Sequence, residues 1–228
     1  MPRMRLDEQM REMKRRLAEE ARTALLMVES ALEALWAGNV DAAGSVRGRD
    51  DLIDSEEVRI EEICFRVMTL QQPVASDFRL IAFVLRVNAD VERVADHACS
   101  IAKVAVALGQ TSIPAWPTAL REMGRRVPEI GHQVLRAMID EDVELARSVL
   151  VGDATIDRLN TRLFDEIIEL METDQDLLRA GLLLYRAGRA LERIGDLMQN
   201  IAEDIVYLGT GSIIRHEKKI GSAGRDRA

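Results

Sequence analysis

Cysteine, proline and aromatic residues are scarce in this chain of 228 residues, and each shortage narrows the class of protein. The two cysteines, Cys64 and Cys99, lie in helical patterns without Cys-x-x-Cys spacing, which argues against a disulfide scaffold and indicates core thiols in a reducing compartment. Aromatic residues make up 4% of the sequence and there are five prolines, against 47% hydrophobic residues. That balance favours helices packed on helices.

An excess of basic residues and a long apolar segment are also missing. The chain has 31 Lys and Arg against 39 Asp and Glu, a formal charge of −8, so it lacks the clustered positive charge that general nucleic-acid binding needs. Its longest purely apolar run, LIAFVL at 80–85, is far too short to cross a bilayer. We therefore expect a soluble cytoplasmic protein that binds no nucleic acid and reaches a membrane only through partners.

What the sequence does contain is helical periodicity over most of its length. Apolar residues recur at spacings of three and four and strict alternation is absent, which predicts an all-α fold. We expect Gly38 to end the first helix, Asn39 or Asp41 to cap the second, and Ser76 or Asp77 to cap the third. Turn signals divide the chain into six long antiparallel helices, at about 6–36, 39–70, 76–108, 118–139, 141–172 and 175–208.

The second half of the chain repeats the first. The segment IDSEEVRIEEICFRVMTL at 53–70 aligns with IDRLNTRLFDEIIELMET at 156–173, an offset of 103. The segment DVERVADHACSIAKV at 90–104 aligns with ALERIGDLMQNIAED at 190–204, an offset of 100. The repeat predicts two tandem three-helix bundles. We assign them to 1–110 and 118–208, joined by a linker at 111–117 and followed by a flexible tail at 209–228.

Each repeat carries two pairs of acids at a spacing of four residues, which stacks side chains on one face of a helix. Counting about 1.5 Å per residue from the turn between the helices brings the pair on one helix level with the pair on the next. Four carboxylates should therefore meet on the outer surface of each bundle. They are Asp50, Asp54, Glu92 and Asp96 in the first repeat and Asp153, Asp157, Glu192 and Asp196 in the second.

Carboxylates gathered in this way repel one another, by about 1 kcal/mol for each pair in contact even in water. A bound cation reverses the sign of that interaction. Oxygen ligands suit hard ions such as Mg²⁺, Mn²⁺ or Ca²⁺, and also iron completed by bridging oxides, while Zn²⁺ is not distinguished from these by the sequence. We favour a metal site in each bundle over the alternative, an acidic face that is merely solvated.

Other charged residues bear on these sites. Glu29 and His132 align at the offset of 103 and lie about one turn from the acids, so either could join its site. A histidine hydrogen-bonded to water or to a neighbouring acid is the simpler interpretation. His97 points about 100° away from Asp96, which makes it a weak ligand candidate. We expect the arginines that recur every seven residues to balance acids on adjacent helices; they are Arg79, Arg86, Arg93, Arg179, Arg186 and Arg193.

Taken together, these features resemble those of the PhoU family, bacterial accessory and regulatory proteins of phosphate transport. The resemblance covers about residues 10–208 and rests on the tandem bundles and on the segments QQPVASDFRLI, VERVADHACSIA and LERIGDLMQNIAE. In that family the acid-x-x-x-Asp motifs are associated with surface metal ions, sometimes as clusters, which the resemblance transfers to the eight acids named above. His97 and Ser100 align with Leu197 and Asn200, so the two sites need not hold the same ion or number of ions.

The resemblance also implies a role and partners. It implies negative control of the phosphate-starvation response through contacts with the ATPase subunit of the phosphate ABC transporter and with a membrane sensor histidine kinase; we also expect a homodimer. The sequence shows no nucleophile with its base, no phosphate-binding Gly loop and no kinase motif, so we expect no enzyme. The alternatives are a di-metal carboxylate oxidase or ferritin-like protein, whose acids would lie inside a four-helix bundle, and a metal-free helical adaptor.

Overall fold

The computed structural model describes residues 2–71, 73–109, 111, 113, 115–151 and 154–212, and each regular element in those ranges is a helix. No helix in these ranges is long and apolar enough to cross a membrane. The first half contains α1 (Pro2–Ala37), α2 (Val40–Arg47), α3 (Asp50–Gln71) and α4 (Ala75–Leu108). The second half contains α5 (Thr118–Asp140), α6 (Val143–Val151), α7 (Ala154–Thr173), the 3-10 helix η1 (Gln175–Leu177) and α8 (Leu178–Thr210).

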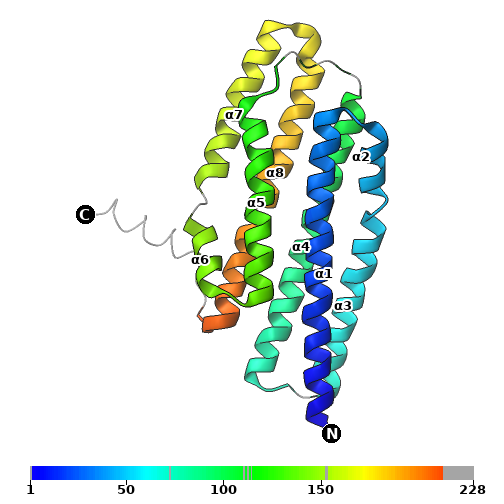
Figure 1. Ribbon diagram of the computed structural model, residues 1–228, viewed down its shortest axis with the longest axis vertical. Coiled ribbons are helices and arrows are strands. Elements are labelled where there is room, and N and C mark those ends of the chain that lie inside the picture. The colour runs from blue at the N-terminus through cyan, green and yellow to red at the C-terminus, as the bar shows by residue number, and fades with distance from the viewer. Residues whose placement is uncertain are drawn as a thin grey trace, which may run out of the picture.

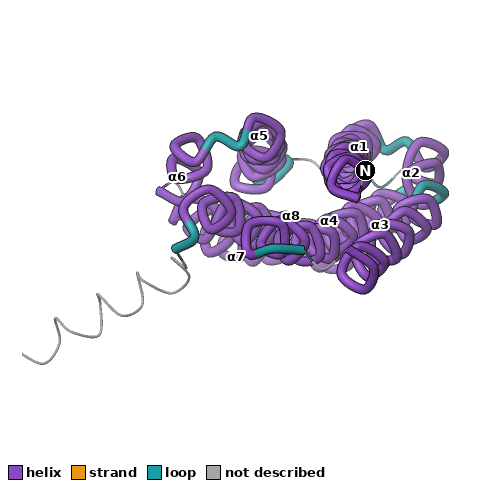
Figure 2. The backbone as a smooth tube through the Cα atoms, turned by 90° about the horizontal axis from the view of Figure 1, so that it is seen from below, coloured by secondary structure: helices purple, strands orange, loops and turns teal. Residues whose placement is uncertain are grey.

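The long helices form two layers. Helices α3, α4, α8 and α7 lie side by side in that order, and α1 and α5, with the short α2 and α6, cover one side of this row (Figure 2). The turn between α3 and α4 and the turn between α7 and α8 lie at opposite ends of the molecule (Figure 1). The predicted pair of tandem three-helix bundles is confirmed, and the two bundles meet with α4 and α8 antiparallel.

One apolar core extends through both bundles. Helices α4 and α8 stand at the centre of the row, so they contact neighbours on most sides. Each therefore has more buried residues than a helix at the edge of the row. Each fully buried Val, Leu or Ile side chain stabilises the fold by roughly 1.5–3 kcal/mol. The central residues follow the predicted spacing of three and four: Val91, Val94, Ala98 and Ile101 on α4, and Leu191, Ile194, Met198 and Ile201 on α8.

A buried carboxylate fixes the register of α4 against α8. Asp204 is 1% exposed, and its Oδ1 accepts from Nη1 of Arg86 at 3.1 Å. The guanidinium groups of Arg79 and Arg86 lie over the ring of Tyr207, 5.9 and 5.7 Å from its centroid. The expectation that the heptad arginines balance acids on adjacent helices is thus confirmed for Arg86, which reaches across to the other bundle.

Two of the helices expected from the sequence are interrupted. The helix expected over 39–70 is divided between α2 and α3 at Gly48, which ends α2 and donates its N–H to the carbonyl of Gly44. Glycine has no Cβ and weakens a helix interior, which explains the break. The helix expected over 141–172 is divided between α6 and α7, and residues 152 and 153 at this division lie outside the described residues.

The residues expected to end the first helix and to cap the second are confirmed, whereas those expected to cap the third helix, which is α4, are not. Gly38 adopts φ +61°, which ends α1, and Asn39 caps α2 by accepting from the N–H of Ala42 at 3.0 Å, both as predicted. The predicted cap of the third helix is wrong. Helix α4 begins after Val74, which supplies no side-chain cap, so Ser76 and Asp77 lie inside its first turn. The extended backbone of Val74, with ψ 173°, follows Pro73 and lets the helix begin at once.

Helix α8 extends beyond the expected start of the tail. Gly209 and Thr210 are helical, and the helix ends at Gly211, whose φ of +74° lies in the left-handed region that glycine adopts without strain. The tail expected over 209–228 therefore begins later than predicted. Its residues from 213 onward lie outside the described residues.

The connection between the bundles is held by an aromatic contact. The rings of Trp36, at the end of α1, and Trp116, just before α5, meet edge to face with centroids 4.9 Å apart. The guanidinium of Arg121 lies over both rings, at 5.2 and 5.5 Å. Such contacts contribute about 0.5–1.5 kcal/mol beyond area burial, and here they join the end of α1 to the start of α5.

Two glycines of α8 allow a matched test of this packing. A Cβ on Gly188 would overlap Cδ2 of the fully buried Leu163, whereas a Cβ on Gly195 would lie 3.5 Å from its nearest neighbour, Ile156. We expect Gly188→Ala to lower the free energy of unfolding by about 1–3 kcal/mol. Gly195→Ala should leave it unchanged or raise it by up to about 1 kcal/mol. Urea denaturation measures both, and equal stabilities of the two variants would contradict the close approach of α7 to α8.

Candidate metal centre

In the first bundle, α3 and α4 bring Asp50, Asp54, Glu92 and Asp96 into one electrostatic cluster. Burial raises the pKa of Glu92 to about 6, and the charges of Asp96, Glu57, Asp54 and Asp50 add to the rise. The pKa of Asp54 is raised by burial, then by Asp50 on its own helix and by Asp96 on the other. The four acids predicted for the first site therefore lie together across α3 and α4.

The cluster is on the side of the helix row away from α1 and α5. Phe83 of α4 lines a hollow together with residues of α1 and α5. A rotation of about 100° per residue places Asp96 about 140° around α4 from Phe83. The acids thus occupy the outer surface, as the sequence predicted.

Helix α1 adds an acid that the sequence patterns did not reveal. The side chain of Glu20 is 2% exposed, and neither of its carboxyl oxygens has a hydrogen-bond partner within the described structure. Burial raises its pKa to about 8, and the charges of Glu56, Glu57 and Glu92 contribute further. A buried carboxyl therefore lies within electrostatic reach of the acids on α3 and α4.

The sequence of α1 contains a signal for the buried position of Glu20. Met13, Leu17, Ala24 and Met27 are buried on α1 at spacings of three and four, and Glu20 occupies the seam position between Leu17 and Ala24. Burial of an unpaired charge costs several kcal/mol or forces the group to be neutral. An acid at such a position indicates a compensating charge or proton nearby.

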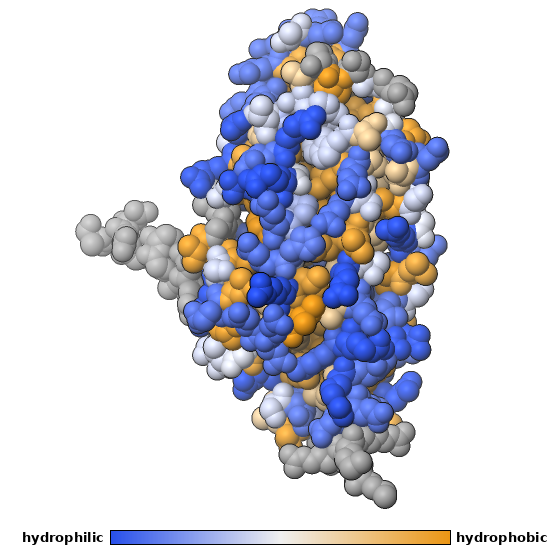
Figure 3. All heavy atoms as spheres, in the orientation of Figure 1, coloured by the Kyte–Doolittle hydropathy of each residue, from blue (hydrophilic) through white to orange (hydrophobic). Residues whose placement is uncertain are grey.

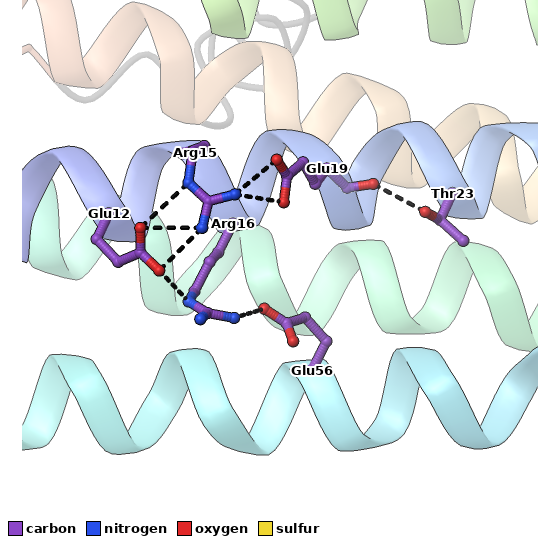
Figure 4. Close-up of polar contacts among 6 residues, drawn as sticks. All are labelled: Glu12, Arg15, Arg16, Glu19, Thr23 and Glu56. Carbon is purple, nitrogen blue, oxygen red and sulfur yellow. Dashed lines mark hydrogen bonds and ion pairs between the residues drawn. The ribbon is translucent and has the colours of Figure 1, made fainter.

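Arg15 and Arg16, about one turn before Glu20 on α1, pair with other acids (Figure 4). Arg16 pairs through Nη1 with Oε1 of Glu56 at 2.6 Å and through Nε with Oε1 of Glu12 at 2.7 Å. Arg15 pairs with Glu12 at 2.9 Å and with Glu19 at 2.7 Å. These pairs follow the exposed side of α1 and its border with α3, and no ion pair of the described residues includes Glu20.

The second bundle surrounds its acids differently. Asp157 lies on α7 and Glu192 and Asp196 on α8, while Asp153 lies outside the described residues. Oε1 of Glu192 pairs with Nη1 of Arg189 at 3.0 Å, and its Oε2 lies 3.7 Å from Nε of Arg193. Arginines from the same helix therefore already neutralise one of the four predicted ligands.

Charges of both repeats act on His97 of α4, the helix that packs against α8. Burial lowers the pKa of His97. The charge of Asp96 raises it, those of Arg93 and Arg193 lower it, and that of Glu192 raises it. Asp96 of the first repeat and Glu192 of the second are therefore both near enough to His97 to act on its pKa.

Glu29 and His132 belong to another surface. Nε2 of His132 and Oε1 of Glu29 form a hydrogen bond of 2.7 Å between α1 and α5, beside a hollow of about 420 Å³ that Leu26 and Ile139 also line. Figure 3 shows this side of the molecule, with apolar patches among hydrophilic ones. The interpretation of His132 as a histidine bonded to a neighbouring acid is confirmed, and neither residue joins the acidic clusters.

Glu129 and His132 have the Glu-x-x-His spacing of di-metal sites, but both lie on the surface and not inside a bundle. Glu129 pairs with Arg125 at 2.7 Å with its side chain 53% exposed, and His132 is bonded to Glu29. Ferritin-like di-metal sites use this spacing with all ligands facing inward. The surface position of both residues therefore speaks against an oxidase centre here.

The predicted ligand atoms suit a hard cation, although the side chains that carry them are spread apart. Over the ranges described, no three Asp, Glu, His or Cys side chains converge closely enough to hold a metal ion. The first-bundle acids are near enough for their charges to raise the pKa of Glu92 and of Asp54, although they do not meet at one point. All of the predicted ligand atoms are carboxyl oxygens, the ligands that Mg²⁺, Ca²⁺ and Mn²⁺ prefer.

Tandem three-helix bundles with a repeated acidic face across the shared central helices define a class of helical-bundle protein. The family model described as "PhoU domain" matches residues 6–105 and 120–205. The chain belongs to the PhoU family, as its sequence motifs suggested.

Individual proteins of the family match about four fifths of the chain. The "Phosphate-specific transport system accessory protein PhoU homolog" of Deinococcus radiodurans is 34% identical over 186 residues, covering 82% of this chain and 87% of that protein. The protein of the same name from Pseudomonas aeruginosa is 35% identical over 190 residues, covering 83% and 78%.

Two solved PhoU structures have the same fold as this chain. The crystal structure of PhoU from Pseudomonas aeruginosa superposes with a TM-score of 0.87 at 32% identity, covering 90% of this chain and 99% of that one. The phosphate transport system regulatory protein PhoU from Streptococcus pneumoniae gives 0.84 at 28% identity, covering 92% and 99%.

The buried Glu20 predicts a pH dependence in protein freed of metal by EDTA. Its pKa of about 8 lies above the ordinary glutamate value of 4.5, so folding binds a proton and the free energy of unfolding should fall as pH rises from about 4.5 to 8. Glu20→Gln should remove that slope and be more stable than the unaltered chain above pH 8, by on the order of a few kcal/mol.

Urea denaturation followed by Trp fluorescence at several pH values measures this effect. Glu8→Gln, at an exposed position of the same helix, serves as the control and should follow the unaltered chain. Parallel pH profiles for Glu20→Gln and the unaltered chain would show that Glu20 is not held protonated by the fold.

Proposed function

We propose that this protein is a non-catalytic regulator of phosphate uptake and of the phosphate-starvation response, which binds divalent or iron-type cations on its acidic clusters. Membership of the PhoU family carries the proposal, since relatives that match four fifths of the chain are named accessory proteins of phosphate-specific transport. Regulation by contact also agrees with the structure, whose long helices present extended charged surfaces.

The repeated carboxylates support the cation. Burial and neighbouring acids raise the pKa of Glu92 and of Asp54, so the charged form of each carboxyl is destabilised when no cation is near. A bound Mg²⁺, Mn²⁺, Ca²⁺, Zn²⁺ or iron ion would supply positive charge that bridges carboxylates. Its ligands would be drawn from the eight acids predicted from the sequence.

The proposed partners are the ATPase subunit of the phosphate ABC transporter and the sensor histidine kinase of the phosphate regulon. The proposal places the protein in the cytoplasm, where both partners expose surfaces, and includes the homodimer expected from the sequence. A cation on the outer face of α4 and α8 would set the charge that this face presents to a partner. Light scattering of the purified protein measures the oligomeric state.

Cation binding should stabilise the folded protein. An ion that binds only the folded state contributes about 2.7 kcal/mol at a hundredfold excess over its Kd. Mn²⁺ should therefore raise the melting temperature and EDTA should lower it, while NaCl of equal ionic strength screens repulsion without bridging carboxylates. Combined Glu92→Ala and Asp96→Ala substitutions should reduce the Mn²⁺ effect substantially. If NaCl reproduced the full shift, the faces would be acidic without being metal sites.

The regulatory role has a direct genetic test. Deletion of the gene should switch on phosphate-starvation genes while phosphate is plentiful, and the intact gene should restore repression. The tagged protein should recover the transporter ATPase or the sensor kinase from cells. Normal repression in the deletion strain, together with recovery of neither partner, would refute the role.

A further inference from the structure

The side of the molecule opposite the acidic clusters has an apolar groove between α1 and α5. We propose that this groove is a docking site for the chain's own segment 213–220, IIRHEKKI, which follows the end of α8. Docked there, the segment joins the end of the second bundle to α1 of the first and covers the apolar surface between them. Neither the acidic clusters nor a bound cation takes part, so this docking is independent of the proposed function.

The groove consists of two adjoining hollows, of about 360 and about 420 Å³, beside α1 and α5 where these helices stand over α4 and α8 (Figure 2). Arg22 and Ile139 line both hollows, so the two form one channel. The other apolar lining includes Leu17, Phe83 and Leu208 in the first hollow and Leu25, Leu26 and Leu135 in the second. Leu26 and Ile139, on different helices, are each 48% exposed. Contiguous exposed apolar surface commonly marks a binding site.

The described chain ends beside the first hollow. Leu208 lines that hollow, and α8 ends three residues later at Gly211. A Cβ on Gly211 would overlap Nη1 of Arg79, which is one turn before Phe83 in the lining of the same hollow. Since four residues of helix rise about 6 Å, Ser212 and the segment after it start close to the groove.

The sequence of the segment favours a short helix. Ser212 precedes it at the position where a hydroxyl caps the first turn, and Gly221 follows it at the position where helices commonly end. In such a helix Ile213, Glu217 and Ile220, at spacings of four and three, share one face. The segment therefore offers two apolar anchors with one carboxylate between them.

The spacing of the two isoleucines matches that of the two hollows. The first hollow is lined along α1 from Lys14 to Arg22 and the second from Arg22 to Glu29, so their centres lie about 11 Å apart at the helical rise per residue. Ile213 and Ile220 are seven residues apart, about 10.5 Å on a helix. A helix lying along the groove inserts one isoleucine into each hollow, the mode in which amphipathic helices bind apolar grooves.

Arg22 provides charge complementarity at the middle of the groove. It is exposed, lines both hollows and belongs to no ion pair of the described residues. The acids of the groove already have basic partners: Glu19 pairs with Arg15, Glu29 with His132, Asp140 with Arg136 and Glu141 with Lys14. With the two isoleucines in the hollows, Glu217 is level with Arg22. The docked segment thus gives this arginine a carboxylate partner.

Disulfide trapping in the full chain tests this docking. The native Cys64 and Cys99 are buried, so cysteines introduced at exposed positions react selectively. Leu26→Cys, in the second hollow, is combined with Ile220→Cys, which leaves the other anchor and both charges of the contact in place. On oxidation with diamide this pair should form a disulfide within one chain, detected by non-reducing electrophoresis and by mass spectrometry of the linked peptides.

The matched control places the second cysteine near the end of α8 but outside the groove. Phe78 is 55% exposed and directly precedes Arg79, which lies against Gly211. It is about 140° around α4 from Phe83, on the side away from the groove. Phe78→Cys with Ile220→Cys should therefore form a disulfide about tenfold more slowly than the first pair.

Exchange of charges tests the register of the segment. Arg22→Glu should slow disulfide formation by the first pair about two- to fivefold, and adding Glu217→Arg should restore the rate. Arg59→Glu is the control, because Arg59 is exposed on α3 and belongs to no ion pair that the structure describes, and it should leave the rate unchanged. A rate that Arg22→Glu does not lower would overturn the contact between Arg22 and Glu217.

Equal rates for the two cysteine pairs, with folding checked by circular dichroism, would overturn the docking itself. A disulfide formed mainly between two chains would assign the groove to the segment of a second copy and overturn its placement within one chain. Should Leu26→Cys destabilise the fold, Arg136→Cys, at an exposed position beside the same hollow, takes its place. Each of these results leaves metal binding and the regulatory role standing.

Discussion

The antiparallel contact between α4 and α8 is the constraint on which the remaining structure depends. Both helices stand in the middle of a row and are covered by α1 and α5, so apolar residues must occupy most of their circumference. Only a narrow outer strip remains for charge. The rotation of the helix from one residue to the next then determines where the acids lie. Glu92 follows the buried Val91, and Glu192 follows the buried Leu191. Both acids therefore lie at the edge of the buried face of their helix.

The two three-helix bundles and the position of the first four acids were predictable because they depend on local periodicity. Spacings of three and four specify which residues are buried, and rise per residue sets Asp54 level with Glu92 whatever the rest of the chain does. The docking of one bundle on the other was not predictable in this way. It depends on contacts such as that of Arg86 with Asp204, 118 residues apart, which no local pattern encodes.

Other features escaped prediction for equally physical reasons. Glu20 was hidden because a pattern of apolar spacing tolerates an occasional polar residue, and its importance becomes visible only once α3 and α4 surround it. Arg189 is one of many charged residues in the sequence, and only the folded structure shows that it pairs with Glu192. The breaks at Gly48 and after Val151 arise from short helices that fold over the row, since continuous helical patterns in sequence do not reveal a change of direction.

The linker between the bundles, closed by Trp36, Trp116 and Arg121, joins two halves that have the arrangement of a symmetric dimer. In a true homodimer every substitution appears twice, and both halves must tolerate it. Covalent fusion removes that restriction, so His97 and Ser100 of the first repeat can stand where the second has Leu197 and Asn200. The short linker thereby gives one molecule two related surfaces that differ in their residues.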